Sequence, residues 1–133
     1  MVYMLDTNIC VFIIKKRPFP VLEKLEKIRG EQICISVVTY AELEYGVERS
    51  SSKKLNQEVL DEFMSHLLVL PWEIEAARQY GKIRTYLEKI GTPIGNMDLL
   101  IAAHALSGKQ ILVTNNLREF KRVPHLKYED WAI

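Results

Sequence analysis

The sequence lacks a hydrophobic run that could cross a membrane, because no apolar stretch among its 133 residues approaches the roughly 20 that a spanning helix needs. We also expect no signal peptide, since Asp6 interrupts the first apolar run before a hydrophobic region of useful length forms. We therefore expect a cytoplasmic protein with no membrane partner. Cysteine is scarce: Cys10 and Cys34 each lie between apolar neighbours, which favours buried free thiols over a disulfide or a metal pair.

An excess of one charge is also missing, with 18 Lys plus Arg against 17 Asp plus Glu. This balance does not by itself indicate nucleic-acid binding. Two basic groups nevertheless stand out as candidates for contacting an RNA backbone, and the alternative for each is a simple solvated face. These groups are Lys15, Lys16 and Arg17, and Arg118, Lys121 and Arg122.

Motifs that would identify several other enzyme classes are absent. There is no Gly-x-Ser-x-Gly nucleophile elbow, no Gly-x-Gly-x-x-Gly turn and no Walker loop. His66, His104 and His125 have no spacing typical of metal ligands. We interpret His104, which lies in an alanine-rich helical segment, as a satisfied core residue.

What the sequence does contain is an alternation of short apolar runs with segments of helical spacing. No repeat, low-complexity tract or Gly/Ser linker divides it, so we expect one domain over residues 1–133. Continuous apolar runs separated by helices predict an α/β fold with a parallel sheet covered on both faces. Strands are expected at 2–5, 33–35, 67–70 and 111–113, with a weak fifth around 126–128. Helices are expected at about 7–14, 21–30, 38–49, 55–64, 73–90 and 96–106.

Two aspartates occupy positions that favour a functional role. Asp6 leaves the first strand and so falls at the carboxyl edge of the sheet, where open α/β sheets bind ligands. It could instead cap the following helix, although Thr7 or Asn8 could do so equally well. Asp98 lies in the first turn of a helix, which Asn96 is expected to cap, and could simply complement the helix dipole. The apolar continuation of that helix argues against this, because a buried carboxylate must be paired or bind a metal.

Two glutamates are further candidates. Glu42 could face Asp6 from a helix that begins after the second strand, or it could close a capping box with Thr39. Glu119 follows the fourth strand and could instead be an exposed loop acid. Asn116 competes with Glu119 for the fourth polar position, and both could contribute.

Four acids without cysteine or histidine suit a hard, oxygen-binding cation such as Mg²⁺. The chain also resembles a known family through four motifs that occur in order over essentially its whole length. They are Leu5-Asp6-Thr7-Asn8, Glu42 after a Ser-x-x-Thr stretch, Ile94-Gly95-Asn96-Met97-Asp98 before Ile101-Ala102-Ala103-His104-Ala105, and Val113-Thr114-Asn115-Asn116 before Glu119-Phe120. In these motifs the chain is similar to the PIN-domain ribonucleases, specifically the VapC toxins of type II toxin–antitoxin systems.

This resemblance implies a three-layer α/β/α PIN-like domain with Mg²⁺ or Mn²⁺ at the edge of its sheet. It implies a metal-dependent endoribonuclease that forms a homodimer and is neutralised by a VapB antitoxin in a hetero-oligomer. It also implies that the substrate is structured RNA, with the anticodon stem-loop of initiator tRNA expected from the subgroup. The chain departs from the family at Asn116, where many members carry Asp, and this shifts the fourth acidic role towards Glu119.

We assign Asp6 and Asp98 as metal ligands, with Glu42 and Glu119 completing the catalytic set. The residues expected to orient these ligands without binding the metal themselves are Thr7, Asn8, Thr114 and Asn116. Two rival functions remain: a phosphoaspartyl enzyme with Asp6 as its nucleophile, and a non-catalytic binding module. Haloacid-dehalogenase-like phosphatases need a second Asp where this chain has Asn8, and the complete set of acids disfavours the second rival.

Overall fold

The computed structural model describes residues 2–16, 19–28 and 32–131. In these residues five parallel strands form one sheet in the order β3-β2-β1-β4-β5. The strands are β1 (Val2–Leu5), β2 (Gln32–Ser36), β3 (Leu68–Leu70), β4 (Ile111–Val113) and β5 (Tyr128–Glu129). At the centre, Met4 of β1 lies opposite Cys34 of β2 and Leu112 of β4.

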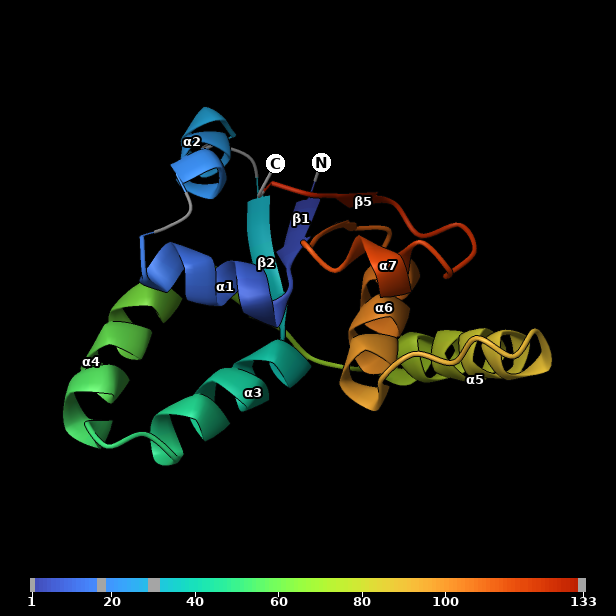
Figure 1. Cartoon of the computed structure of the whole chain (residues 1–133), viewed down its shortest axis with the longest axis horizontal. Helices are drawn as coiled ribbons and strands as arrows, with labels where there is room; N and C mark the ends of the chain where they lie inside the picture. Colours follow the sequence, from blue (N-terminus) through green and yellow to red (C-terminus); the bar gives the residue numbers. More distant parts are fainter. Residues whose placement is uncertain (1, 17–18, 29–31, 132–133) are drawn as a thin grey trace.

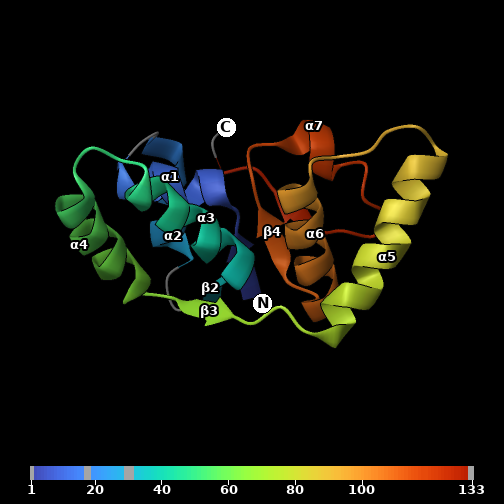
Figure 2. The ribbon, with the colours of Figure 1, turned by 90° about the horizontal axis from the view of Figure 1, so that it is seen from below.

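The helices divide between the two faces of the sheet, as Figures 1 and 2 show. One group comprises α1 (Thr7–Ile14), α2 (Phe19–Lys27), α3 (Val37–Glu48) and α4 (Lys53–Met64). The other comprises α5 (Ile74–Lys89), α6 (Asn96–Gly108) and α7 (Leu117–Phe120). The predicted three-layer α/β/α arrangement is therefore confirmed.

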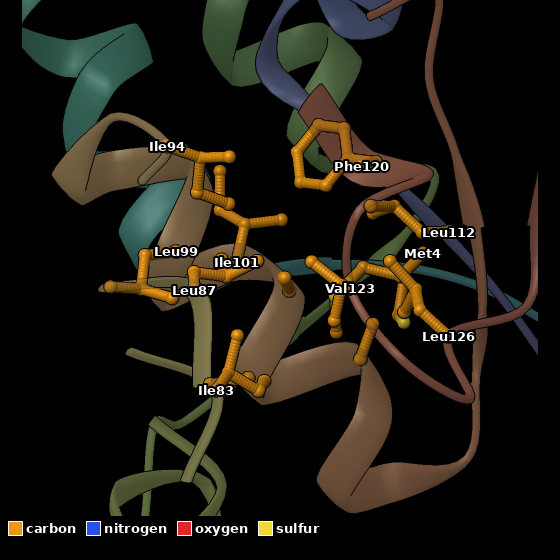
Figure 3. Packing of buried hydrophobic residues seen from close by; sticks show 14 residues of the cluster. Met4, Ile83, Leu87, Ile94, Leu99, Ile101, Leu112, Phe120, Val123 and Leu126 are labelled. Carbon is orange, nitrogen blue, oxygen red and sulfur yellow. The ribbon is translucent and has the colours of Figure 1, made fainter. Parts of the chain in front are cut away.

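Alternation along the strands explains why both faces are covered, because successive side chains point to opposite sides. Tyr3 and Leu5 pack into the core beneath α1–α4, whereas Met4 between them packs into the core beneath α5 and α6. Figure 3 shows the second core, in which Ile83 and Leu87 of α5 lie beside residues of α6. Burying a large aliphatic side chain contributes roughly 1.5–3 kcal/mol, so each layer is fastened mainly by such contacts.

The third apolar run differs from its expected environment. β3 is an edge strand, and its Leu68 and Val69 remain 55% and 38% exposed. An apolar run therefore predicted a strand correctly but did not reveal that it lies at the edge. Among the described residues, no helix is both long and apolar enough to span a membrane.

Both expected ends of α6 were also wrong. Gly95, not Asn96, is the N-cap of α6, and Asn96 is its first helical residue. The helix continues through Ser107 and Gly108, ending where Lys109 adopts a left-handed conformation with φ of 57°. These differences leave Asp98 in the first turn of α6, as expected.

Candidate active site

Asp6 is the buried centre of the site. Its backbone N–H donates to the Val113 carbonyl at 3.0 Å, which extends the pairing of β1 and β4 by one residue. One side-chain oxygen accepts from the Ile9 N–H at 3.0 Å, so of the three candidate caps Asp6 itself caps α1, and Thr7 and Asn8 do not. Burial raises the pKa of the Asp6 carboxyl to about 6, against hydrogen bonds from Thr114 and Ile9 that lower it.

Glu42 approaches from α3 and does not close a capping box. The N-cap of α3 is Ser36, whose hydroxyl accepts from the Val38 N–H. Glu42 therefore lies in the second turn of α3, and its side chain does not reach back to the start of the helix. Its Oε1 accepts a 2.5 Å hydrogen bond from the Thr7 hydroxyl. The negative charge of Glu42 is close enough to Asp6 to contribute to the raised pKa there.

Asp98, Asn116 and Glu119 form a connected group from α6, the loop after β4, and α7. The Asn116 side-chain amide donates to Asp98 Oδ2 at 3.2 Å and to Glu119 Oε2 at 3.3 Å. Burial and a hydrogen bond to Glu119 raise the pKa of Asp98 to about 7, with the charges of Asp6 and Glu42 adding to the effect. The pKa of Glu119 is lowered because it accepts hydrogen bonds from Asp98, Asn116 and the Gly95 backbone.

The four acids thus gather at the carboxyl edge of β1 and β4. They form two pairs, Asp6 with Glu42 and Asp98 with Glu119, and do not surround one common point. Among the described residues, no three Asp, Glu, His or Cys side chains converge closely enough to hold an ion. The physical reason is that each acid is turned towards a protein donor: Thr7 holds Glu42, while Asn116 joins Asp98 to Glu119.

The residues nevertheless fit a divalent cation. Burial first, and neighbouring carboxylates second, raise the pKa of both Asp6 and Asp98, and a cation would offset both effects by neutralising the charge. Their oxygen atoms are the donors that Mg²⁺ and Mn²⁺ favour.

Of the residues expected to orient the acids, Thr7 and Thr114 contact them, whereas Asn8 lies on the surface beside them. Thr7 contacts Glu42, and Thr114 contacts both Asp6 and the backbone N–H of Asn116, which lies 2.8 Å from its Oγ1. Asn8 is exposed on the first turn of α1 and lines a groove next to Glu42.

The two basic groups lie on separate elements. Lys15 and Lys16 are exposed at the end of α1, and Arg17 lies outside the described residues. Arg118 and Lys121 are exposed on and just after α7. Arg122 donates to the Pro93 carbonyl at 3.2 Å, and its charge helps to lower the pKa of Glu119, so it lies beside the acids.

A groove of about 680 Å³ between α1, α3 and α4 opens beside Glu42. Its walls include Lys15, Tyr45 and Arg49, and the Arg49 guanidinium lies 5.3 Å from the centre of the Tyr45 ring. Neither Tyr45 nor Arg49 was predicted as a site residue. Their spacing of three and seven residues from Glu42 places them on the same face of α3, which is the signal that could have identified them.

Comparison with known proteins identifies the class first. Residues 3–126 match the PIN domain. A parallel sheet whose carboxyl edge gathers these acids agrees with that match, and the chain belongs to the PIN-domain family.

More particular relatives narrow the class. The chain is 48% identical over 132 residues to "Ribonuclease VapC2" of Rickettsia felis, with 98% of each chain covered. It is 44% identical over 130 residues to the "tRNA(fMet)-specific endonuclease VapC" of Salmonella typhimurium, again with 98% of each covered. The structure of VapBC2 from Rickettsia felis bound to a promoter DNA fragment superposes on this chain with a TM-score of 0.93. The two sequences are 47% identical, and the superposition covers 98% of this chain and 99% of that chain. Within the PIN-domain family, the chain is a VapC-type ribonuclease, as the four motifs predicted.

Proposed function

We propose that this protein is a Mg²⁺- or Mn²⁺-dependent endoribonuclease toxin of a VapBC module, acting in the cytoplasm as one PIN domain over residues 1–133. The observation that carries the proposal is the gathering of Asp6, Glu42, Asp98 and Glu119 at one edge of the sheet, with the pKa values of both aspartates raised. A divalent ion bound there supplies charge neutralisation for the phosphodiester and lowers the pKa of the attacking water.

The chain's own residues have distinct roles in this proposal. Asp6 and Asp98 would hold the ion, since burial and the charges of nearby carboxylates make them the acids that gain most from a cation. Glu42 and Glu119 complete the set and orient water. Thr7, Asn8, Thr114 and Asn116 form the surrounding shell, and the contacts to Glu42, Asp6 and Asp98 support three of these four assignments.

RNA binding is assigned to the basic residues near the site. The exposed side chains of Lys15 and Lys16 at the end of α1, and of Arg118 and Lys121 by α7, are free to meet phosphates. Arg122 lies beside Glu119, and its charge helps to lower the pKa of that carboxyl. Arg17 is included from the sequence alone.

The proposed substrate is initiator tRNA, cleaved in its anticodon stem-loop. Two relatives support this choice: the proteins of Salmonella typhimurium and Shigella flexneri that are named tRNA(fMet)-specific endonucleases are 44% and 46% identical to this chain. The fold alone does not select one RNA over another.

The proposed regulator is a VapB antitoxin, bound to a homodimer of this chain in a hetero-oligomer. Similar solved structures from Rickettsia felis and Salmonella typhimurium are VapBC complexes, which supports this assembly. The groove next to Glu42 has a mainly apolar lining that also includes Lys15 and Arg49. A VapB segment seated there would cover the approach to the acids.

The experiment is metal-dependent cleavage of initiator tRNA by the purified protein, with elongator methionine tRNA as the matched substrate control. Cleavage should require Mg²⁺ or Mn²⁺, stop in excess EDTA, and disappear in the Asp98→Asn variant. Full activity in EDTA would exclude the metal. Covalent capture of an aspartyl-phosphate mimic on Asp6 would favour the phosphoaspartyl alternative.

A further inference from the structure

His104 is a buried polar residue that the proposed chemistry does not use. It lies on α6 with only 5% of its surface exposed, and its Nδ1 is 2.7 Å from the hydroxyl oxygen of Ser36. Ser36 is fully buried at the junction of β2 and α3, 68 residues away in sequence. The contact therefore joins α6 directly to the start of α3 through the end of the sheet.

The hydrogen-bond pattern around Ser36 indicates which way this bond runs. The Ser36 oxygen already accepts from the Val38 N–H at 3.1 Å, as the N-cap of α3. Its single hydrogen needs an acceptor in a buried place, and an unprotonated Nδ1 provides one. The imidazole hydrogen then lies on Nε2, which leaves it available to the Pro71 carbonyl that accepts from this ring.

The surroundings favour this neutral form of the ring. Burial lowers the pKa of His104, although the charge of Glu73 and the Pro71 carbonyl oppose that effect. A second bond, from the Trp72 indole N–H to the Leu100 carbonyl at 3.0 Å, fastens the chain after β3 to the same helix. The ring of His104 thus links three elements: α6, the N-terminus of α3 and the segment that follows β3.

The two helices that meet at this link carry acids from opposite layers of the fold. Glu42 is on α3, on one side of the sheet, and Asp98 is on α6, on the other. Fixing the first turn of α3 against α6 fixes the direction from which Glu42 approaches Asp98.

We propose that His104 is a positioning residue for RNA cleavage, whose Nδ1 accepts the Ser36 hydroxyl hydrogen and so holds α3 and α6 in the register that brings Glu42 and Asp98 together. This rests on the proposed function, because it assumes that these two acids act on one substrate. His104 touches none of the reacting atoms, and its effect is transmitted through Ser36.

Two substitutions separate the two bonds of the ring. In His104→Asn the shorter amide can place an oxygen near the Nδ1 position and keep the Ser36 bond. In His104→Gln the longer amide can reach the Pro71 carbonyl and loses the Ser36 bond. We expect His104→Gln to lower kcat about 10- to 100-fold with KM for RNA unchanged, in the range seen when supporting contacts of a metal site are removed. We expect His104→Asn to stay within about 3-fold of the wild type in kcat, by the same reasoning.

A matched control is Ser107→Ala, which removes a hydroxyl bond to the His104 carbonyl on the same helix without touching Ser36. It should leave kcat unchanged. Mn²⁺ binding without RNA, measured by electron paramagnetic resonance, gives a readout other than turnover and should weaken in His104→Gln but not in Ser107→Ala. A purely structural role predicts instead that both His104 variants lose stability and kcat in parallel.

The wild-type protein provides a test that does not depend on any variant folding. Nitrogen-15 NMR of the His104 ring should show a neutral imidazole with hydrogen on Nε2. Hydrogen on Nδ1, or a folded His104→Gln variant with wild-type kcat and Mn²⁺ affinity, would overturn the positioning role. Wild-type protein that does not cleave RNA with Mn²⁺ would instead contradict the proposed function.

Discussion

At the scale of single residues, Asp6 combines a structural and a chemical role. One oxygen caps α1 through the Ile9 N–H, while burial and the nearby Glu42 raise its pKa to about 6. Asp6→Asn keeps a good N-cap and removes the buried charge. We expect this variant to lose cleavage by orders of magnitude, yet to be more stable than wild type in EDTA at pH 7.5, by on the order of 1 to 3 kcal/mol. Urea unfolding gives the stability change.

Asp6→Ala is the control for the cap. It removes the charge as well, but leaves the Ile9 N–H without its acceptor, which costs about 1 kcal/mol. It should therefore be less stable than Asp6→Asn. An Asp6→Asn protein that is no more stable than wild type would show that the charge carries no cost in the metal-free fold.

Glu119 and Asn116 are the two candidates for the fourth polar position of the site. Asn116 turns its amide nitrogen, a donor, towards both Asp98 and Glu119, whereas a metal needs an acceptor. Glu119→Gln should therefore impair metal-dependent cleavage much more than Asn116→Ala, which should cost about 10- to 100-fold as a supporting contact. Cleavage rates measured across Mn²⁺ concentrations compare the two. A dead Asn116→Ala with a normal Glu119→Gln would reverse the assignment.

At the scale of elements, apolar runs and helical spacing predicted the strands and the six longer helices because burial on each face imposes those periods. They did not predict α7, which at four residues is too short to show a helical period. They could not predict that β3 lies at the edge, since exposure of Leu68 depends on what packs beside it. Caps were less predictable, because Asp6, Thr7 and Asn8 are all suitable cap residues and only the path of the chain decides between them. Asp6 and Glu119 became candidates because they follow strands, and Glu42 and Asp98 because they lie near helix starts, but the pairing of Asp98 with Glu119 through Asn116 needed the fold.

The shortest helix, α7, depends on one anchor. It spans only Leu117–Phe120, and Phe120 is fully buried in the core that contains Met4 and Leu112. Phe120→Ala should lower the free energy of unfolding by about 3–5 kcal/mol and release Glu119 from its place. Urea denaturation measures the first effect. Lys127→Ala, an exposed change in the segment that follows, is the control and should stay within about 0.5 kcal/mol of wild type; an equal loss in both would contradict the anchor.

At the scale of the whole molecule, the three layers bring acids from the end of β1 and from α3, α6 and α7 to one edge of the sheet. When no cation is bound there, some of these carboxyl groups are protonated. Asp6 and Asp98 have raised pKa values of about 6 and 7. Between about pH 4 and 7 the folded protein therefore binds more protons at these groups than the unfolded chain, so they make stability fall as pH rises. The lowered pKa of His104 acts in the opposite direction, because the unfolded chain takes up a proton there as pH falls below its ordinary value of 6.5.

Comparing two proteins that both keep His104 removes its contribution and leaves that of the two aspartates, together with the shift at Glu119 that depends on Asp98. The Asp6→Asn/Asp98→Asn double variant keeps His104 and cannot titrate at either acid. We expect the free energy of unfolding of the metal-free wild type, relative to this variant, to decline steadily from pH 4.5 to pH 7.5. Mn²⁺ should reverse the decline for wild type only, because it replaces the protons that Asp6 and Asp98 release on binding, and so it should stabilise the protein more at pH 7.5 than at pH 5. Unfolding curves at a series of pH values, with EDTA or Mn²⁺, measure both effects. If the stability of the wild type relative to the variant were constant across this range, the pKa values of Asp6 and Asp98 would not be raised in the folded protein.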